Sequence, residues 1–402
     1  MTDRQPTIME LFDRIELPES NNELEDFPEE EILPENVNTT DQKELINAYA
    51  AGFFDGEGYI GTYEQKLNNP PTILLKTMIG CTDLQILTKL KQEYCGKIYI
   101  HKKRKGKEHH KQAWHWDIKD RSTLKKFLTQ ILPYSQYKKP QIELGLTFIQ
   151  LKDSINGKAT QEQYNIMKNI HEEFKRLKNT QLSSCEINDF NTQIQEMNVD
   201  KNQLSLLDLL DSNKKDIEII KVETEPEKIK PTYYSKELIN AYTAGFFDGE
   251  GYIGTDEQKL NNLPTIRLTT QLSNTDNEIL KKFKQEFGGE ICMKKKKNGI
   301  EHYKQSWSWN IQNRPTIKKF LTQILPYSQY KKPQIELGLT FIQLKDSING
   351  KATQEQYNLM KKIHEEFKRL KHTELSVCEL TNFNTQIKEM NVDKYQKSMM
   401  DF

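Results

Sequence analysis

Two acidic side chains occupy equivalent places in a nine-residue motif that occurs twice. The motif reads Ala-Ala-Gly-Phe-Phe-Asp-Gly-Glu-Gly at 50–58 and Thr-Ala-Gly-Phe-Phe-Asp-Gly-Glu-Gly at 243–251. Its small residues allow two helices to pack backbone to backbone, and its last glycines let the chain turn away at the helix end. Such packing would bring Glu57 and Glu250 together, and two repelling carboxylates favour a bound cation. We therefore predict a site for Mg²⁺, or for Mn²⁺ in its place, that activates water for phosphodiester hydrolysis.

The motif lies within a much longer repeat. Residues 43–201 align with residues 236–394 at a constant offset of 193 without a gap, and the 41 residues 125–165 recur unchanged at 318–358. Each copy is long enough to be a domain. The simpler interpretation of one Asp-Gly-Glu-Gly is an ordinary turn, but its occurrence twice behind the same small-residue helix weakens that interpretation. The predicted division is an acidic, unstructured tail over 1–42, a first domain over 43–201, a linker over 202–235, a second domain over 236–394 and a C-terminal tail over 395–402.

Both copies show the same alternation of helical and strand periods. In the first copy it predicts a helix over 43–54, strands over 59–65 and 72–80, a helix capped by Thr82, and a hairpin formed by 97–103 and 109–118. Three helical stretches follow, near 122–132, 138–153 and 160–178. The predicted fold class is therefore α+β, with two tandem α-β-β-α-β-β-α domains.

The two faces of the predicted sheets repeat unequally. On the face expected to cover the core, side chains keep their character in both copies, as with Trp116 and Trp309 or Ile100 and Met293. On the other face the copies differ, which suits a surface that reads two different half-sites of a nucleic acid but is also expected from neutral drift. The candidate DNA contacts are Tyr63, Gln65, Lys76, Lys97, His101, His115, Gln258, Arg267 and Gln271 on the strands, and Lys102, Lys103, Arg104, Lys105, Lys294, Lys295, Lys296 and Lys297 at the hairpin tips.

Charge and composition narrow the class of protein. The chain has 58 basic and 58 acidic side chains, but residues 1–42 hold 13 acidic residues and only two arginines. The two domains therefore carry a basic surplus, which favours a polyanionic partner. We expect neither a membrane helix nor a secretory signal, because no apolar run is long enough. The five cysteines form no Cys-x-x-Cys pair, so no zinc site is expected.

The motif pair and the order of elements resemble the LAGLIDADG homing endonucleases, and the duplication resembles their two-motif, monomeric branch. The segment 127–133 followed by Lys138, repeated at 320–326 with Lys331, is similar to the chloroplast rRNA-intron members. The resemblance implies a pseudo-two-fold saddle of two antiparallel sheets over double-stranded DNA, with the motif helices at the domain interface. It also points to an organelle as the cellular location.

The resemblance implies roles for single residues of this chain. The metal ligands would be Glu57 and Glu250 with the backbone carbonyls of Gly56 and Gly249. The side chains of Asp55 and Asp248 would brace the helix ends, and Lys138 and Lys331 would stabilise charge or position water. Asn274, at the end of a strand, would order solvent. Its counterpart is Cys81, and this departure sets the two half-sites apart.

The implied activity is a double-strand break at a long, pseudo-palindromic DNA site, with short 3′ overhangs. Two other functions stay open: an intron RNA maturase that assists splicing, and a non-cleaving DNA-binding regulator on the same fold. A regulator needs no metal-binding pair. The presence of the acidic residue in both motifs therefore favours the nuclease.

Overall fold

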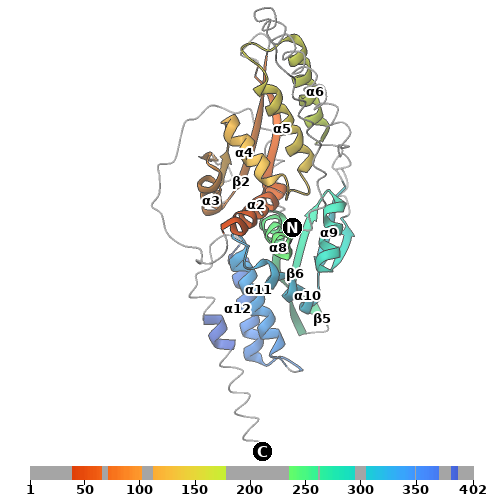
Figure 1. Cartoon of the computed structure of the whole chain (residues 1–402). Coiled ribbons are helices and arrows are strands. Elements are labelled where there is room, and N and C mark those ends of the chain that lie inside the picture. Colours follow the sequence, from red (N-terminus) through yellow and green to blue (C-terminus); the bar gives the residue numbers. More distant parts are fainter. Residues whose placement is uncertain are drawn as a thin grey trace, which may run out of the picture.

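The structure is a computed structural model of the whole chain, shown in Figure 1. It describes residues 39–65, 71–101, 112–177, 235–260, 263–294, 305–348, 350–370 and 382–387. The first half of the chain forms the upper domain in Figure 1 and the second half the lower domain. Two helices, α2 and α8, lie side by side between them.

The two domains repeat the same order of elements. The first contains α2 (Thr39–Glu57), β1 (Gly58–Gln65), β2 (Thr72–Cys81), α3 (Leu84–Tyr94), β3 (Lys97–Ile100), β4 (Trp114–Asp117), α4 (Arg121–Ile131), α5 (Lys139–Asp153) and α6 (Gln161–Leu177). The second contains α8 (Lys236–Glu250), β5 (Gly251–Leu260), β6 (Leu263–Asn274), α9 (Asn277–Phe287), β7 (Glu290–Met293), β8 (Trp307–Ile311), α10 (Arg314–Ile324), α11 (Lys332–Asp346) and α12 (Gln354–Arg369).

Each domain contains a four-stranded antiparallel sheet. The strand order is β1-β2-β4-β3 in the first domain and β5-β6-β8-β7 in the second. The register is the same in both, since Ile79 faces Trp116 and Leu272 faces Trp309 across the central strands. The predicted α+β class, with two antiparallel sheets, is confirmed.

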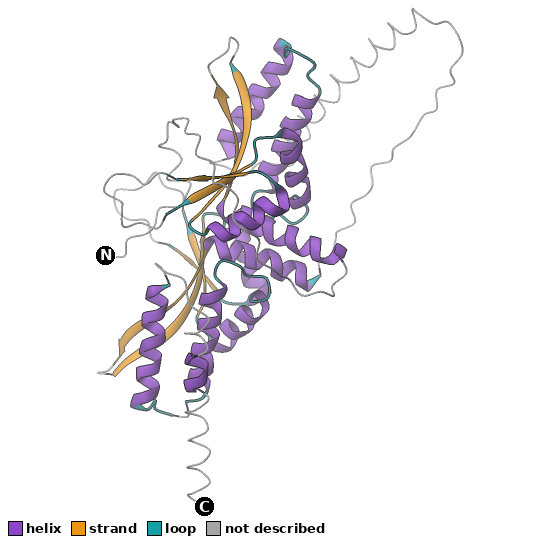
Figure 2. Ribbon diagram, turned by 90° about the vertical axis from the view of Figure 1, so that its left-hand side faces the viewer, coloured by secondary structure: helices purple, strands orange, loops and turns teal. Residues whose placement is uncertain are grey.

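Helices cover one face of each sheet. In the first domain α5 and α6 pack on β1 and β2, and α3 packs on β3 and β4. The strand residues that point toward them alternate in sequence and are buried, and Trp116 is 1% exposed where its ring meets the edge of Phe127 of α4. In Figure 2 most helices accordingly lie on one side of the strands. Among the described residues, no helix covers the opposite face of either sheet.

Local details differ from the sequence predictions at several points. Helix α2 was predicted over 43–54 but runs over Thr39–Glu57, so it begins inside the segment 1–42 that was predicted to be unstructured. The N-cap of α3 is Asp83 and not Thr82, because the Asp83 carboxylate accepts hydrogen bonds from the backbone N–H of Gln85 at 2.7 Å and of Ile86 at 3.3 Å. Ile100 and Met293, which were expected in the core, are 43% and 66% exposed. Both lie near the end of an edge strand, where only one neighbouring strand covers them.

Candidate active site

The two motif helices cross at very short range, because each carries a glycine at the crossing point. A Cβ atom on Gly52 would lie 2.0 Å from the carbonyl oxygen of Tyr242, and one on Gly245 would lie 2.1 Å from the carbonyl oxygen of Tyr49. No larger residue fits without separating the helices. The small residues of the motif therefore form the interface between the domains.

Beyond the crossing, each helix has a fully buried aspartate in its last turn, Asp55 in α2 and Asp248 in α8. The Asp55 carboxylate accepts hydrogen bonds from the Ser135 hydroxyl at 2.6 Å and from the backbone N–H groups of residues 136, 137 and 138 at 2.7, 2.9 and 2.9 Å. The fifth donor, the Tyr242 hydroxyl at 2.8 Å, comes from the other domain. Asp248 is held in the same way by residues 328–331 and by Tyr49. Each aspartate ties its helix end to a loop of its own domain and to a tyrosine of the other domain.

The two glutamates lie next to each other where the helices end. The Glu57 Cγ lies 3.1 Å from the point where a Cβ on Gly249 would be, and the Glu250 Cγ lies 3.5 Å from the corresponding point on Gly56. Burial, followed by the charge of Glu250, raises the pKa of Glu57 to about 8, although Lys331 and Lys138 oppose the rise. A carboxylate pair that resists ionisation in this way would gain from a divalent cation between its members.

Two lysines complete the charged centre. The Nζ of Lys138 donates to the Asp55 carbonyl oxygen, and the Nζ of Lys331 donates to the Asp248 carbonyl oxygen and, at 3.4 Å, to that of Gly249. Burial lowers the pKa of both lysines, while nearby carboxylates act in the opposite direction. Residues that are 83 positions apart in the sequence thus come into contact at the helix ends.

Several residues of this centre had no assigned role in the sequence. The tyrosines Tyr49 and Tyr242 cross the domain interface to the opposite aspartate, and the Tyr330 hydroxyl lies 3.0 Å from the Thr82 hydroxyl of the first domain. Tyr137 makes the equivalent hydrogen bond to Thr275. All four tyrosines are the same in both copies of the repeat. This identity was the one feature of the sequence that could have indicated a role for them, but it is equally expected of core residues.

The side chains of Asn274 and Cys81 make the same kind of contact, since each accepts a hydrogen bond from the backbone N–H two residues further on. The Asn274 Oδ1 accepts from the N–H of Asp276 at 2.8 Å, and the Cys81 Sγ accepts from the N–H of Asp83 at 3.3 Å. Both side chains are buried, and burial raises the pKa of the Cys81 thiol to about 12. The thiol therefore stays protonated at neutral pH, whereas Asn274 has an amide NH₂ in addition to its capping oxygen.

The predicted DNA contacts are distributed over the uncovered sheet faces. Tyr63, Gln65, Lys76, Lys97, His101 and His115 lie on or beside the first sheet, and Arg267, Gln271 and Lys294 on or beside the second. Residues 102–105 and 295–297 lie outside the described residues, as does the Gln258 side chain. The predicted set is thus only partly placed by the structure.

The first sheet brings together an aromatic group that the second lacks. The His115 ring stacks on Tyr99 with centroids 5.3 Å apart and meets His101 edge-on at 5.7 Å, while the Lys119 Nζ lies 4.9 Å from the Tyr99 ring centre. Burial and the charges of His101, Lys76 and Lys119 lower the pKa of His115 to about 4. Asp117, which the sequence analysis did not single out, lies opposite Lys97 on the same strand pair.

A metal at this centre could take few of its ligands from acidic or histidine side chains. Within the described parts of the chain, no three His, Cys, Asp or Glu side chains are grouped as a metal site. Mg²⁺ typically uses one or two carboxylates and completes its shell with water and substrate phosphates. The paired carboxylates of Glu57 and Glu250 fit that requirement.

None of the helices that the structure describes has the length and apolar character of a membrane span.

Comparison with known proteins agrees with this geometry. Residues 243–337, which begin in the second motif and end within α11, match the family model described as LAGLIDADG endonuclease. The fold is that of a two-motif LAGLIDADG homing endonuclease. The first domain has the same fold through the repeat, with its own copy of the motif at 50–58.

Solved LAGLIDADG structures match both domains at once. The homing endonuclease I-SmaMI bound to cleaved DNA has a TM-score of 0.53 at 16% identity, over 79% of this chain and 95% of its own. I-LtrWI bound to target DNA has a TM-score of 0.54 at 12% identity, over 81% and 98% of the two chains. I-SmaMI has also been solved with uncleaved DNA in the presence of calcium ions, with a TM-score of 0.53 and 15% identity over 80% and 98%. No curated protein matches the sequence.

Proposed function

We propose that this protein is a site-specific DNA endonuclease that makes metal-dependent double-strand breaks at a long, pseudo-palindromic site and leaves short 3′ overhangs. The observation that carries this proposal is the meeting of Glu57 and Glu250, 193 residues apart, at the crossing ends of two symmetry-related helices. A single domain would supply only one of these carboxylates. The LAGLIDADG fold and the DNA in related structures support the same conclusion.

Divalent metal ions, Mg²⁺ with Mn²⁺ as a substitute, would be held by the Glu57 and Glu250 carboxylates and by the backbone carbonyls of Gly56 and Gly249. When bound, the metal supplies an activated water and neutralises charge on the leaving oxygen. The chain holds the carboxylates in place through the five hydrogen bonds to each neighbouring aspartate. We expect Asp55 and Asp248 to position the ligands without touching the DNA.

The buried lysines place positive charge beside the same centre. The Lys138 Nζ donates to the backbone carbonyl oxygen of Asp55, and the Lys331 Nζ donates to that of Asp248, so one lysine lies on each side of the pseudo-two-fold axis. A cation fixed at each half of the centre would stabilise negative charge that develops on the cleaved phosphate. Asn274 would order solvent in one half only, since Cys81 occupies the equivalent place in the other.

The two uncovered sheet faces would bind the duplex. Strands of 8 to 12 residues form the long hairpins β1–β2 and β5–β6, and each spans roughly 30 Å at about 3.3 Å per residue. That length is near one turn of duplex DNA, so two sheets cover about two turns. The strand and hairpin-tip residues named above would contact bases and phosphates.

Cleavage of a randomised duplex-DNA library with Mg²⁺ tests the proposal. We expect breaks at one enriched site that need the metal, and at least a 100-fold loss of double-strand breaks in Glu57→Gln and in Glu250→Gln, a few kcal/mol of lost charge stabilisation. Glu143→Gln, on the outer helix α5, is the matched control and should cleave normally. Equal cleavage by all four proteins would refute the two-carboxylate centre.

The other candidate functions give different results in the same assay. A non-cleaving regulator would enrich one DNA site without breaking it, with or without metal. A maturase would show no DNA selectivity and would bind intron RNA instead. Residence in an organelle and likeness to the chloroplast rRNA-intron members remain predictions.

A further inference from the structure

A basic notch lies at the open edge of the second sheet, outside the candidate active site. It is a pocket of about 400 Å³ between β6, the start of α10 and the end of α11. Strand β8 pairs with β6 only over residues 270–274, so residues 265–269 of β6 have a free edge there. Three cations line the notch: Arg267, Arg314 and Lys345.

Two of these cations form no ion pair within the part of the chain that the structure describes. Arg314 pairs with Asp346 at 3.1 Å, and Lys318 shares the same carboxylate at 3.3 Å. Arg267 and Lys345 form no ion pair with any carboxylate among the described residues, and the Lys345 Nζ lies 5.7 Å from the centre of the Phe341 ring. Asp256 faces Arg267 across the strands, but its Oδ2 accepts a hydrogen bond from Thr269 at 3.1 Å. The notch therefore has an excess of positive charge.

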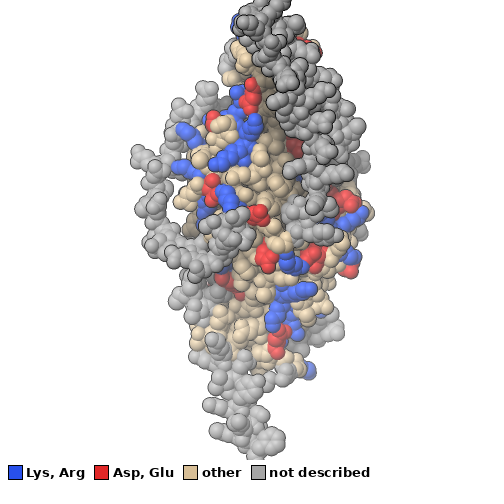
Figure 3. Space-filling model, in the orientation of Figure 1, with Lys and Arg blue, Asp and Glu red and all other residues tan. Residues whose placement is uncertain are grey.

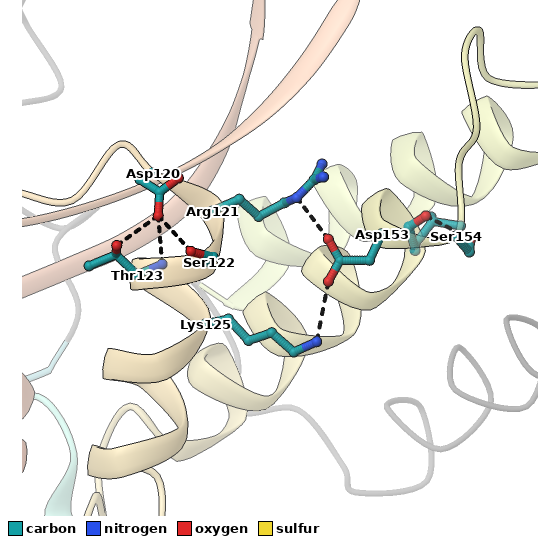
Figure 4. A network of polar contacts seen from close by, with 8 residues as sticks. Asp120, Arg121, Ser122, Thr123, Lys125, Asp153 and Ser154 are labelled. Atoms are coloured by element: carbon teal, nitrogen blue, oxygen red, sulfur yellow. Dashed lines mark hydrogen bonds and ion pairs between the residues drawn. The ribbon is translucent and has the colours of Figure 1, made fainter.

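The first domain provides a natural comparison at the same place. Figure 4 shows that Arg121 and Lys125 both form ion pairs with Asp153, at 2.8 and 3.2 Å. Asp153 corresponds to Asp346 of the second domain. Lys152 corresponds to Lys345 and lies over Phe148 at 5.8 Å. Leu74 stands where the second domain has Arg267, and Lys76, which stands in place of the notch residue Thr269, lies near the Asp117 carboxylate.

Arg267 joins the notch to the sheet face that would bind DNA. It is exposed and lies between the buried Ile266 and Leu268, so its Cβ points away from the helices, and the residue also lines the notch. Burial lowers the pKa of Lys345, and the positive charges of Arg314 and then Arg267 lower it further, which places the three groups near one another. On the face that Figure 3 displays, acidic and basic side chains are interspersed.

We propose that this notch holds a backbone phosphate of the bound duplex, so that Arg267 contacts a phosphate and not a base edge. The inference rests on the proposed DNA-binding function. Contact with the DNA backbone would then extend around the sheet edge in the second half-site only, which gives the two half-sites unequal affinity. A fork of guanidinium donors beside an ammonium group is the side-chain chemistry that binds phosphate.

The test is the salt dependence of duplex binding by Arg267→Leu and by the reciprocal variant Leu74→Arg. Each substitution introduces the residue of the other domain, and thermal melting verifies the fold. A plot of log affinity against log salt should become shallower by about 0.9 for Arg267→Leu and steeper by about 0.9 for Leu74→Arg. Lys345→Gln should also make the plot shallower, and Lys152→Gln should do so by less.

Sequence dependence separates a phosphate contact from a base contact. For a phosphate contact, Arg267→Leu weakens binding to the enriched site and to random duplex by the same factor, about 5-fold. An unchanged salt slope, or a loss confined to the enriched site, would overturn the inference and leave the endonuclease proposal standing. Failure of the unmodified protein to bind duplex DNA at all would overturn both.

Discussion

The domain interface and the uncovered sheet faces differ in how closely the two halves of the molecule repeat. At the interface the five hydrogen bonds to Asp55 and the five to Asp248 agree within 0.1 Å, and both sets include a tyrosine from the opposite domain. On the sheet faces Tyr99 and His115 stack in one half. Cys292 and Ser308 stand at the same places in the other.

The difference fits the proposed function. If the protein cleaves both strands of a duplex, a symmetric centre suits the same phosphodiester bond in each strand. The bases on either side of the proposed pseudo-palindromic site would not be identical, so the surfaces that read them would be expected to diverge. A substitution that disturbs the symmetric interface should therefore cost more than one that exchanges residues between the sheet faces.

The largest effect is expected for Gly52→Ala or Gly245→Ala. The new Cβ would lie 2.0 or 2.1 Å from a backbone carbonyl oxygen, so the motif helices must separate. We expect a loss of about 4 kcal/mol or more in the free energy of unfolding, measured by chemical denaturation.

Gly145→Ala is the control, because the nearest atoms to its Cβ belong to side chains and not to backbone: Ile60 Cδ1 at 2.8 Å and Leu128 Cδ1 at 3.5 Å. It should cost about 1 kcal/mol. Similar losses in the interface and control variants would show that the close helix crossing does not hold the domains together.

Asp55→Asn and Asp248→Asn come next. An amide NH₂ replaces an oxygen that accepts hydrogen bonds from buried donors, and at least one donor is left unpaired. Each variant should lose about 3 kcal/mol of stability, and the two losses should agree within about 0.5 kcal/mol. The exposed Asp153→Asn, which breaks only surface ion pairs, should cost less than about 1 kcal/mol. A difference of several kcal/mol between the stability losses of the two variants would show that the two halves of the interface are not energetically equivalent.

Glu57→Gln should stabilise the metal-free protein in a pH-dependent way. The folded protein keeps a proton on Glu57 up to a pKa of about 8, while the unfolded chain releases it near 4.5, so stability falls as the pH rises between these values. The glutamine variant avoids this fall and should gain about 2.5 kcal/mol in stability over the unmodified protein between pH 5 and pH 7. Saturating Mg²⁺ should cancel the advantage, and an advantage that is independent of pH would contradict the strained carboxylate pair.

The smallest effect is expected on the sheet face, for His115→Ser, which introduces the residue of the second domain. His115 has its pKa lowered to about 4, so it is neutral at pH 7 and becomes protonated more readily in the unfolded chain, whose pKa is about 6.5. Stability from this group is complete above pH 6.5 and is lost as the pH falls toward 4. With solvent screening, the unmodified protein should lose about 1 kcal/mol between pH 7 and pH 5, which the variant keeps. Identical acid melting curves would show that the histidine is not held neutral.

Much of the fold could be predicted because it is encoded locally. The period of apolar residues located the helices and the hairpins, and the ungapped repeat showed that whatever fold one half adopts, the other adopts too. The cap of α3 was misassigned by one residue, since Thr82 can cap a helix as well as Asp83 can, and Thr275 stands at the same place in the second copy. In the structure these threonines instead bond to tyrosines of the opposite domain.

By itself the sequence determined the duplication, the order of elements, the small-residue helix and the two acidic positions, because each is a matter of residue type and spacing along the chain. The tertiary structure alone decided that Tyr49 reaches Asp248 across 199 residues, that Lys138 and Lys331 turn under the helix ends, and that Arg267 lies at a free sheet edge beside Lys345. These contacts depend on how two domains dock and where one strand stops. No local periodicity carries that information, since packing between distant segments sets it.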